Sequence, residues 1–222
     1  TVSQLNNENW YGVNDNADAY EFVADPVNGF SASPCLRIEN FGNANTSKDE
    51  LRSTTFDLRL FSSVSVSFKV AYAQTAPNDL SKLILYASND CGKTWAPRWS
   101  ATGSSMAIAA NTPSYYTPAG NQDWKPYTVT IPSSLLAQTN QFKFVFENKN
   151  GNNLYFDDFS INGPYLDVAQ LKYPLNGMAN VPSNQVIYWK AMGGGVESYE
   201  YQIDSDPSFT SGNLQTGINP YV

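Results

Sequence analysis

The sequence of 222 residues contains no histidine. This absence removes the most common general base and the most common zinc ligand of proteins. It excludes a Ser-His-Asp triad, a Cys-His pair and an H-E-x-x-H zinc site within the chain. Hydrolysis by two carboxylates remains conceivable, but the sequence marks out no such pair. We therefore expect a chain that is not an enzyme.

Basic residues are also scarce. Lys and Arg total 13 against 20 Asp and Glu, which gives a formal net charge of −7. A nucleic-acid partner requires a basic surface, so none is expected here. No apolar run approaches the roughly 20 residues of a membrane-spanning helix, so no membrane span is expected. No signal segment opens the sequence either, and Thr1 is expected to be the start of a processed or excised piece.

Cysteine is limited to Cys35 and Cys91, so only one disulfide pairing exists. Closing that loop would stabilise the fold by about 4 kcal/mol through the entropy of the unfolded chain. The disulfide would indicate an oxidising, extracytoplasmic compartment. The alternative is two unpaired, buried thiols.

Period-two alternation of apolar and polar residues is frequent in the sequence. It runs through 64–70, 127–131 and 142–146, and it is typical of half-buried strands. Loops rich in Asn, Gly, Ser, Thr and Pro separate such runs, as at 40–47 and 110–122. Helical periodicity is nearly absent. About ten short strands with irregular links predict an all-β, antiparallel sandwich.

The composition changes near Gly163 and Pro164. We therefore expect a first domain at 1–164, a linker at 165–170 and a second domain at 171–222. The second segment reads as a strand, a Pro-marked turn, a strand with a core Trp and a further alternating strand, which is the opening half of a fibronectin-III-like or Ig-like sandwich.

Such a sandwich needs about 100 residues. Half of one leaves an apolar sheet face bare. The natural protein is therefore expected to continue past Val222, or another segment is expected to complete the fold.

An Asp-box with the spacing S-x-D-x-G-x-T-W follows the apolar run at 83–86. Its defining residues are Ser88, Asp90, Gly92, Thr94 and Trp95. The carboxylate is expected to accept bonds from turn amides, the glycine to take a backbone angle that other residues avoid, and the tryptophan to fold back as an apolar plug. The motif predicts an ordered hairpin without chemistry. A sialidase would repeat it around a propeller, whereas this chain has one copy.

Several motifs together resemble a known module. They are C-L-R-I-E-N at 35–40, D-E-L-R-S at 49–53, D-C-G-K-T-W at 90–95 and the run 151–161. Over roughly residues 1–163, the chain is similar to the jelly-roll accessory domain of secreted bacterial proteins that use type IX secretion. That domain often follows a pappalysin-type metalloprotease and is similar to MAM and carbohydrate-binding jelly rolls.

The resemblance implies a jelly-roll fold, a secreted or cell-surface location and neighbouring domains of the same polypeptide as partners. The zinc protease itself would belong to another region of the parent protein. We expect a non-catalytic accessory or binding module that flanks a metalloprotease or adhesin region. The alternatives are a carbohydrate-binding module, or a subunit of an extracellular adhesive assembly that contacts a glycan or a cell-surface protein.

The run 154–161 contains a break in its alternation. Phe156 and Phe159 are three positions apart, so in a regular strand their side chains would point to opposite faces. A β-bulge that changes this parity is therefore expected at Asp157 and Asp158. In similar jelly rolls an Asp at the position of Asp158 holds a structural calcium. The resemblance therefore implies calcium as a cofactor, with Asp157 and Glu8 as further carboxylates. The alternative is that both aspartates bond loop amides.

Asn14, Asn16 and Asp18 alternate like the first half of an EF-hand loop. The obligatory glycine is replaced by Ala19, and Asp25 stands where the closing Glu would be. An EF-hand is therefore not expected. The segment is either a generic cation loop or a solvated turn.

Aromatic residues can stack on sugars, and the set expected to be exposed is Trp10, Tyr11, Trp99, Tyr115 and Tyr116. Three of them are taken as candidate binding residues: Trp99, Tyr115 and Tyr116. The two tyrosines lie in the 110–122 loop, and binding residues often occupy such loops. The alternative for all three is packing within the core or beneath a loop.

Overall fold

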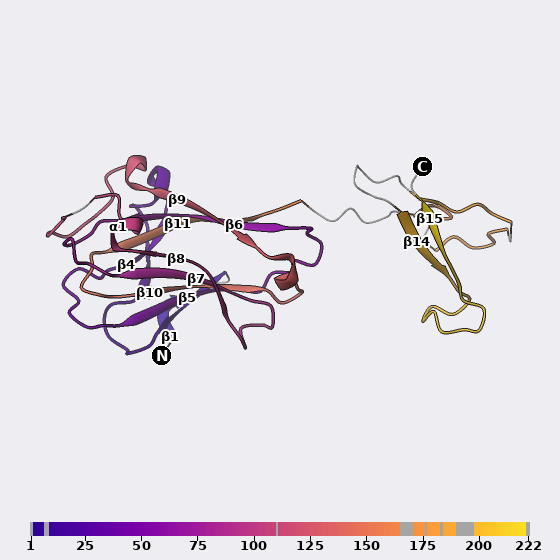
Figure 1. Ribbon diagram of the computed structural model, residues 1–222, viewed down its shortest axis with the longest axis horizontal. Coiled ribbons are helices and arrows are strands. Elements are labelled where there is room, and N and C mark those ends of the chain that lie inside the picture. Colours follow the sequence, from indigo (N-terminus) through magenta and orange to yellow (C-terminus); the bar gives the residue numbers. More distant parts are fainter. Residues whose placement is uncertain are drawn as a thin grey trace. The chain divides into compact units, whose positions relative to one another are not determined.

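The structure is a computed structural model that describes residues 2–6, 9–109, 111–164, 171–175, 177–182, 184–189 and 198–220 (Figure 1). The chain forms two compact units, Thr1–Tyr165 and Leu166–Val222, and each is described by itself.

Two antiparallel sheets make up the described part of the first unit. The first sheet has the order β1 (Val2–Asn6), β2 (Trp10–Asn14), β5 (Lys48–Ser53), β10 (Gln141–Glu147), β7 (Lys82–Ser88) and β8 (Ala96–Thr102). The second has the order β3 (Phe22–Asp25), β4 (Cys35–Ile38), β11 (Leu154–Asn162), β6 (Val64–Tyr72) and β9 (Lys125–Ile131). This arrangement confirms the prediction of an antiparallel jelly-roll sandwich.

Helical structure in the described residues is confined to single turns. These are η1 (Phe30–Ala32), α1 (Gly103–Met106), η2 (Asn121–Asp123) and η3 (Ser133–Leu135). No described helix has the length and apolarity needed to cross a membrane.

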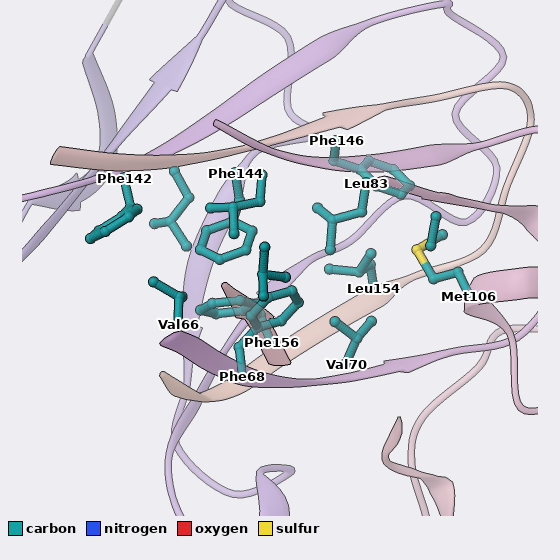
Figure 2. Packing of buried hydrophobic residues seen from close by; sticks show 14 of the residues in the cluster. Val66, Phe68, Val70, Leu83, Met106, Phe142, Phe144, Phe146, Leu154 and Phe156 are labelled. Carbon is teal, nitrogen blue, oxygen red and sulfur yellow. The ribbon is translucent and has the colours of Figure 1, made fainter. Parts of the chain in front are cut away.

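The core lies between the two sheets, where the alternating residues of facing strands meet. Figure 2 shows Phe142, Phe144 and Phe146 of β10 opposite residues of the other sheet. The ring centroids of Phe144 and Phe156 are 4.5 Å apart, and those of Phe144 and Phe68 are 4.9 Å apart. Each fully buried phenylalanine stabilises the fold by about 1.5–3 kcal/mol. The predicted strand alternation therefore corresponds to the core face.

The predicted bulge is confirmed in β11. The pairing with β6 shifts register between Asp157 and Ser160, and Asp158 has a φ of +52°. The shift lets Phe156 and Phe159 both contact the core, although their parity differs. An unbroken strand would have turned Phe159 to the opposite face.

The structure contradicts the disulfide between Cys35 and Cys91, since both are free thiols. Cys35 lies on β4, buried in a second apolar cluster with Tyr116 and Trp124. Cys91 is exposed in the turn that follows β7 of the other sheet. Both cysteines do sit where strands meet loops, but the strands belong to different sheets. An oxidising compartment therefore has no support from a disulfide.

The second unit contains two antiparallel hairpins among its described residues. One joins β12 (Leu171–Tyr173) to β13 (Tyr188–Trp189), and the other joins β14 (Ser198–Ile203) to β15 (Gln215–Pro220). Large apolar side chains of this unit are exposed, including Leu171, Ile187, Tyr201 and Ile203. The fibronectin-III-like interpretation stays a prediction.

Candidate binding face

The Asp-box forms the hairpin between β7 and β8, and its side chains satisfy one another as predicted. The Asp90 carboxylate accepts hydrogen bonds from Thr94 Oγ1 (2.6 Å), the Thr94 amide (2.9 Å) and Ser88 Oγ (2.7 Å). The same donors, the Thr94 hydroxyl foremost, lower the pKa of Asp90 to about 2. Gly92 has a φ of +77°, which a residue with a Cβ adopts only with strain.

Trp95 folds back over the hairpin turn, since a Cβ on Gly92 would lie 3.2 Å from its ring, and the ring is half-buried over charged residues. The Lys143 ammonium lies 4.9 Å from its ring centroid, and the Arg52 guanidinium carbon lies 5.8 Å away. Both cations are on the outer face of the six-stranded sheet, since Leu51 and Phe144 beside them face the core. The tryptophan therefore covers the outer face.

A row of polar and aromatic residues crosses four adjacent strands beneath Trp95. Tyr11 of β2 pairs with Arg52 of β5, Arg52 with Lys143 of β10, and Lys143 with Tyr86 of β7. The Lys143 ammonium lies 5.2 Å from the Tyr86 ring centroid. We call the following residues the Trp95 face: Tyr11, Glu50, Arg52, Tyr86, Trp95 and Lys143.

Glu50 holds the two cations of the Trp95 face in place. Its carboxylate accepts a hydrogen bond of 2.6 Å from Arg52 Nε and one of 2.8 Å from Lys143 Nζ. Burial raises the pKa of Glu50, but the bonds from Lys143 and Arg52 outweigh burial and leave that pKa below its usual value. Glu50 is therefore ionised at neutral pH and serves as an acceptor, whereas a general acid needs a raised pKa.

The three aromatic residues chosen from the sequence do not come together. Trp99 of β8 is half-buried against Phe68 and Tyr127, with ring centroids 5.2 and 4.5 Å away. Tyr116 is buried in the second apolar cluster. Tyr115 is 44% exposed and lies edge-on to Phe41. Packing therefore accounts for Tyr116 and for much of Trp99, while Tyr115 is the most exposed of the three.

The aspartates of the β11 bulge have protein partners. Asp157 Oδ2 accepts bonds from the Phe30 amide (2.8 Å) and from Ser33 Oγ (3.1 Å), and Asp158 forms an ion pair with Lys69. Glu8 lies outside the described residues. Within the described ranges, no group of three Asp, Glu or Cys side chains could hold a metal. Calcium at Asp157 and Asp158 stays a prediction.

Sequence reasoning missed most of the Trp95 face. A usable signal was present, because Lys143 stands between Phe142 and Phe144 and must point away from the core. The same parity argument applies to Arg52. The sequence does not reveal that these two strands are neighbours, and only the register brings the residues into one row.

No protein-family model and no curated protein matches the chain. Among the solved structures similar to it are two cleaved adhesin domains of Lys-gingipain from Porphyromonas gingivalis W83. The K1 domain is 18% identical with a TM-score of 0.51, over 70% of this chain and 90% of that domain. The K3 domain is 15% identical with a TM-score of 0.52, over 69% and 91%. The fold is shared.

A carbohydrate-binding module solved with β-1,4-galactotriose is more distant. It is 14% identical, with a TM-score of 0.42 over 70% of this chain and 88% of that module. The adhesin likeness shows a common β-sandwich and leaves the ligand of this chain open.

Proposed function

We propose that residues 1–164 are a non-catalytic binding module of a secreted or cell-surface protein, and that the Trp95 face binds saccharide. The observation that carries the proposal is the row Tyr11, Arg52, Lys143 and Tyr86 with Trp95 over its centre.

The chemistry of the Trp95 face suits a sugar. Aromatic rings offer apolar platforms with a polar rim. The guanidinium of Arg52 and the ammonium of Lys143 can donate hydrogen bonds to hydroxyl or carboxylate oxygens of a ligand. The tyrosine and tryptophan rings are half-buried, which leaves part of each accessible.

Rigidity is a further point in favour of binding. The row residues stand on strands, and Glu50 fixes both cations through the bonds described above. A site whose side chains are already ordered loses little conformational freedom when it binds. Glu50, paired and ionised, supplies no proton, so the proposed role is capture of a ligand.

The wider setting of the proposal comes from the sequence resemblance. The module would sit in a multidomain polypeptide beside a metalloprotease or adhesin region. The shared fold of the gingipain adhesin domains is compatible with this setting. Type IX secretion and the pappalysin neighbour remain predictions.

A glycan array with the full chain tests the binding role. Trp95→Ala and Tyr86→Ala are expected to weaken saccharide binding by about tenfold or more, since each removes a stacking platform. Tyr115→Ala is the matched control, because its exposed ring lies outside the Trp95 face. Silence across a broad array, or loss of binding with Tyr115→Ala alone, would contradict the proposal.

A second candidate is a subunit of an extracellular adhesive assembly. The second unit has a cavity of about 590 Å³ between its two hairpins, lined largely by apolar residues such as Leu171, Ile187 and Trp189. Exposed apolar surface of this kind favours association. Light scattering that shows concentration-dependent oligomers, reduced by Ile187→Glu, would support this candidate; a monomer at all concentrations would oppose it.

A further inference from the structure

The outer face of the six-stranded sheet carries more positive than negative charge on its central strands, although the chain as a whole is acidic. Side chains of β5, β10 and β7 with the opposite parity to the core residues Leu51, Phe144 and Leu83 point outward. The charged members of this outward set are Lys48, Glu50, Arg52, Lys82, Lys143 and Glu147. Four cations therefore stand with two carboxylates, in a chain whose formal net charge is −7.

Within the Trp95 face, two cations share one carboxylate. Arg52 and Lys143 both pair with Glu50, and in the described part of the chain no other carboxylate forms an ion pair with either of them. The carboxylate of the adjacent turn, Asp90, already accepts bonds from Ser88 and from Thr94. The Trp95 face therefore keeps one unit of positive charge that no described carboxylate balances.

Arg52 is the cation of the Trp95 face that a ligand can reach. Its side chain is 29% exposed, whereas those of Glu50 and Lys143 are each 12% exposed. Glu50 occupies Nε and Nη2 of the guanidinium, and the Tyr11 phenol bonds the guanidinium as well. A guanidinium has five N–H donors, so donors remain for an acceptor on the ligand. The Lys143 ammonium, held between two aromatic rings, adds its charge close by.

We propose that the saccharide bound by the Trp95 face is acidic, and that Arg52 receives its carboxylate or sulfate group. This inference rests on the saccharide-binding role argued above and names the class of sugar. A charge-assisted hydrogen bond to an anionic oxygen is roughly twice as strong as a bond to a neutral hydroxyl. The planar guanidinium can also contact two oxygens of one anionic group at once. An anionic group would balance the unpaired charge of the face.

The acidic character of the whole chain opposes this preference only weakly. Exposed charges that are more than about 8 Å apart are largely screened at physiological salt. A ligand group at Arg52 therefore responds to the cations beside it more than to carboxylates elsewhere on the surface. A half-buried site is screened less than open surface, so the local attraction persists.

An array of acidic oligosaccharides, each printed beside its carboxyl-reduced or desulfated counterpart, tests the class with the full chain. Uronates and sulfated sugars form separate arms, so the array identifies which anionic group is bound. Within a pair that binds, the acidic member is expected to bind about tenfold more tightly at low salt. This advantage is expected to shrink as sodium chloride is raised, because part of the attraction is screened.

Arg52→Met is expected to lower the affinity for the acidic member about tenfold and to change the affinity for the neutral member by less than about twofold. Lys82→Met is the matched control. Lys82 points to the same outer face, opposite Glu147 and outside the Trp95 face, so its loss is expected to change neither affinity. Calorimetric titration measures the affinities, and urea unfolding shows that each variant is folded.

Glu50→Gln distinguishes an Arg52 that binds ligand from one that only pairs with Glu50. Removal of the internal carboxylate leaves more positive charge for the ligand. The acidic member is therefore expected to bind at least about threefold more tightly, with no gain for the neutral member. A purely structural cluster would lose stability in urea without any gain in affinity for acidic sugars, which would contradict the proposal.

The remaining outcomes separate this inference from the saccharide role. Equal binding of acidic and neutral members, or an acidic preference that survives Arg52→Met, would overturn the acidic class and leave the saccharide role standing. An acidic preference lost in Lys82→Met but retained in Arg52→Met would place the anionic group outside the Trp95 face. Binding of no saccharide, acidic or neutral, would overturn both proposals.

Discussion

Lys143 Nζ lies 4.9 Å from the centroid of the Trp95 ring and donates a hydrogen bond of 2.8 Å to Glu50. The ammonium thereby connects the Asp-box hairpin to the central strands of the six-stranded sheet. The tryptophan of the motif is held by charge as well as by apolar contact, and its position defines the proposed binding face.

A double-mutant cycle with Trp95→Leu and Lys143→Met is expected to give a coupling free energy of about 1 kcal/mol, because a partly desolvated cation–π pair has that strength. Urea unfolding of the four proteins measures it. The control cycle combines Trp95→Leu with Arg59→Met. The Arg59 guanidinium pairs with Asp57, so this cycle is expected to give no coupling free energy. Equal values in the two cycles would show that Lys143 and Trp95 do not interact.

The lowered pKa of Asp90 predicts that part of the free energy of unfolding is lost in acid. Its folded-state pKa is about 2, against an ordinary value of 3.8, so its stabilising contribution is complete above the ordinary value and is lost as the pH falls toward 2. Urea midpoints of the wild type and Asp90→Asn are expected to differ at neutral pH and to converge near pH 2. A constant difference across that range would contradict the assignment.

Asn153 bridges two loops that lie far apart in the sequence. Its Oδ1 accepts bonds from the amides of Asn40 (2.8 Å) and Phe41 (2.9 Å), and its Nδ2 donates to the Tyr116 carbonyl (3.0 Å). Asn153→Ala leaves buried groups unpaired and is expected to destabilise the chain by about 3 kcal/mol in urea unfolding.

The exposed Asn162 supplies the matched control for Asn153. Among the described residues, its side chain bonds only the Ser160 hydroxyl, so Asn162→Ala is expected to change the free energy of unfolding by less than about 0.5 kcal/mol. Equal effects of the two substitutions would show that burial of the Asn153 bonds has no energetic consequence.

The two thiols are expected to react differently. Cys91 is exposed, whereas burial, reinforced by the charges of Asp25 and Asp157, raises the pKa of Cys35 to about 12. A chromogenic thiol reagent should therefore detect one thiol in the folded chain and two in denaturant. Cys91→Ser should remove the fast reaction. If no thiol reacted in denaturant, the two cysteines would be joined in a disulfide and this prediction would be wrong.

Local patterns in the sequence were sufficient for much of the fold. The alternation at 64–70 and 142–146 marks β6 and β10 because side chains in a strand point alternately to its two faces. The bulge follows from the parity of Phe156 and Phe159 for the same reason. The Asp-box bonds are likewise local, since Ser88, Asp90 and Thr94 lie within one turn.

Tertiary structure alone decided which strands are neighbours and therefore which side chains meet. Parity turns Lys143 outward, but only the pairing of β10 with β5 and β7 sets it between Arg52 and Tyr86. Tyr115 and Tyr116 are adjacent in sequence, yet one is exposed and the other is buried against Tyr155. Burial depends on contacts between distant segments, and the order of residues along the chain does not record those contacts.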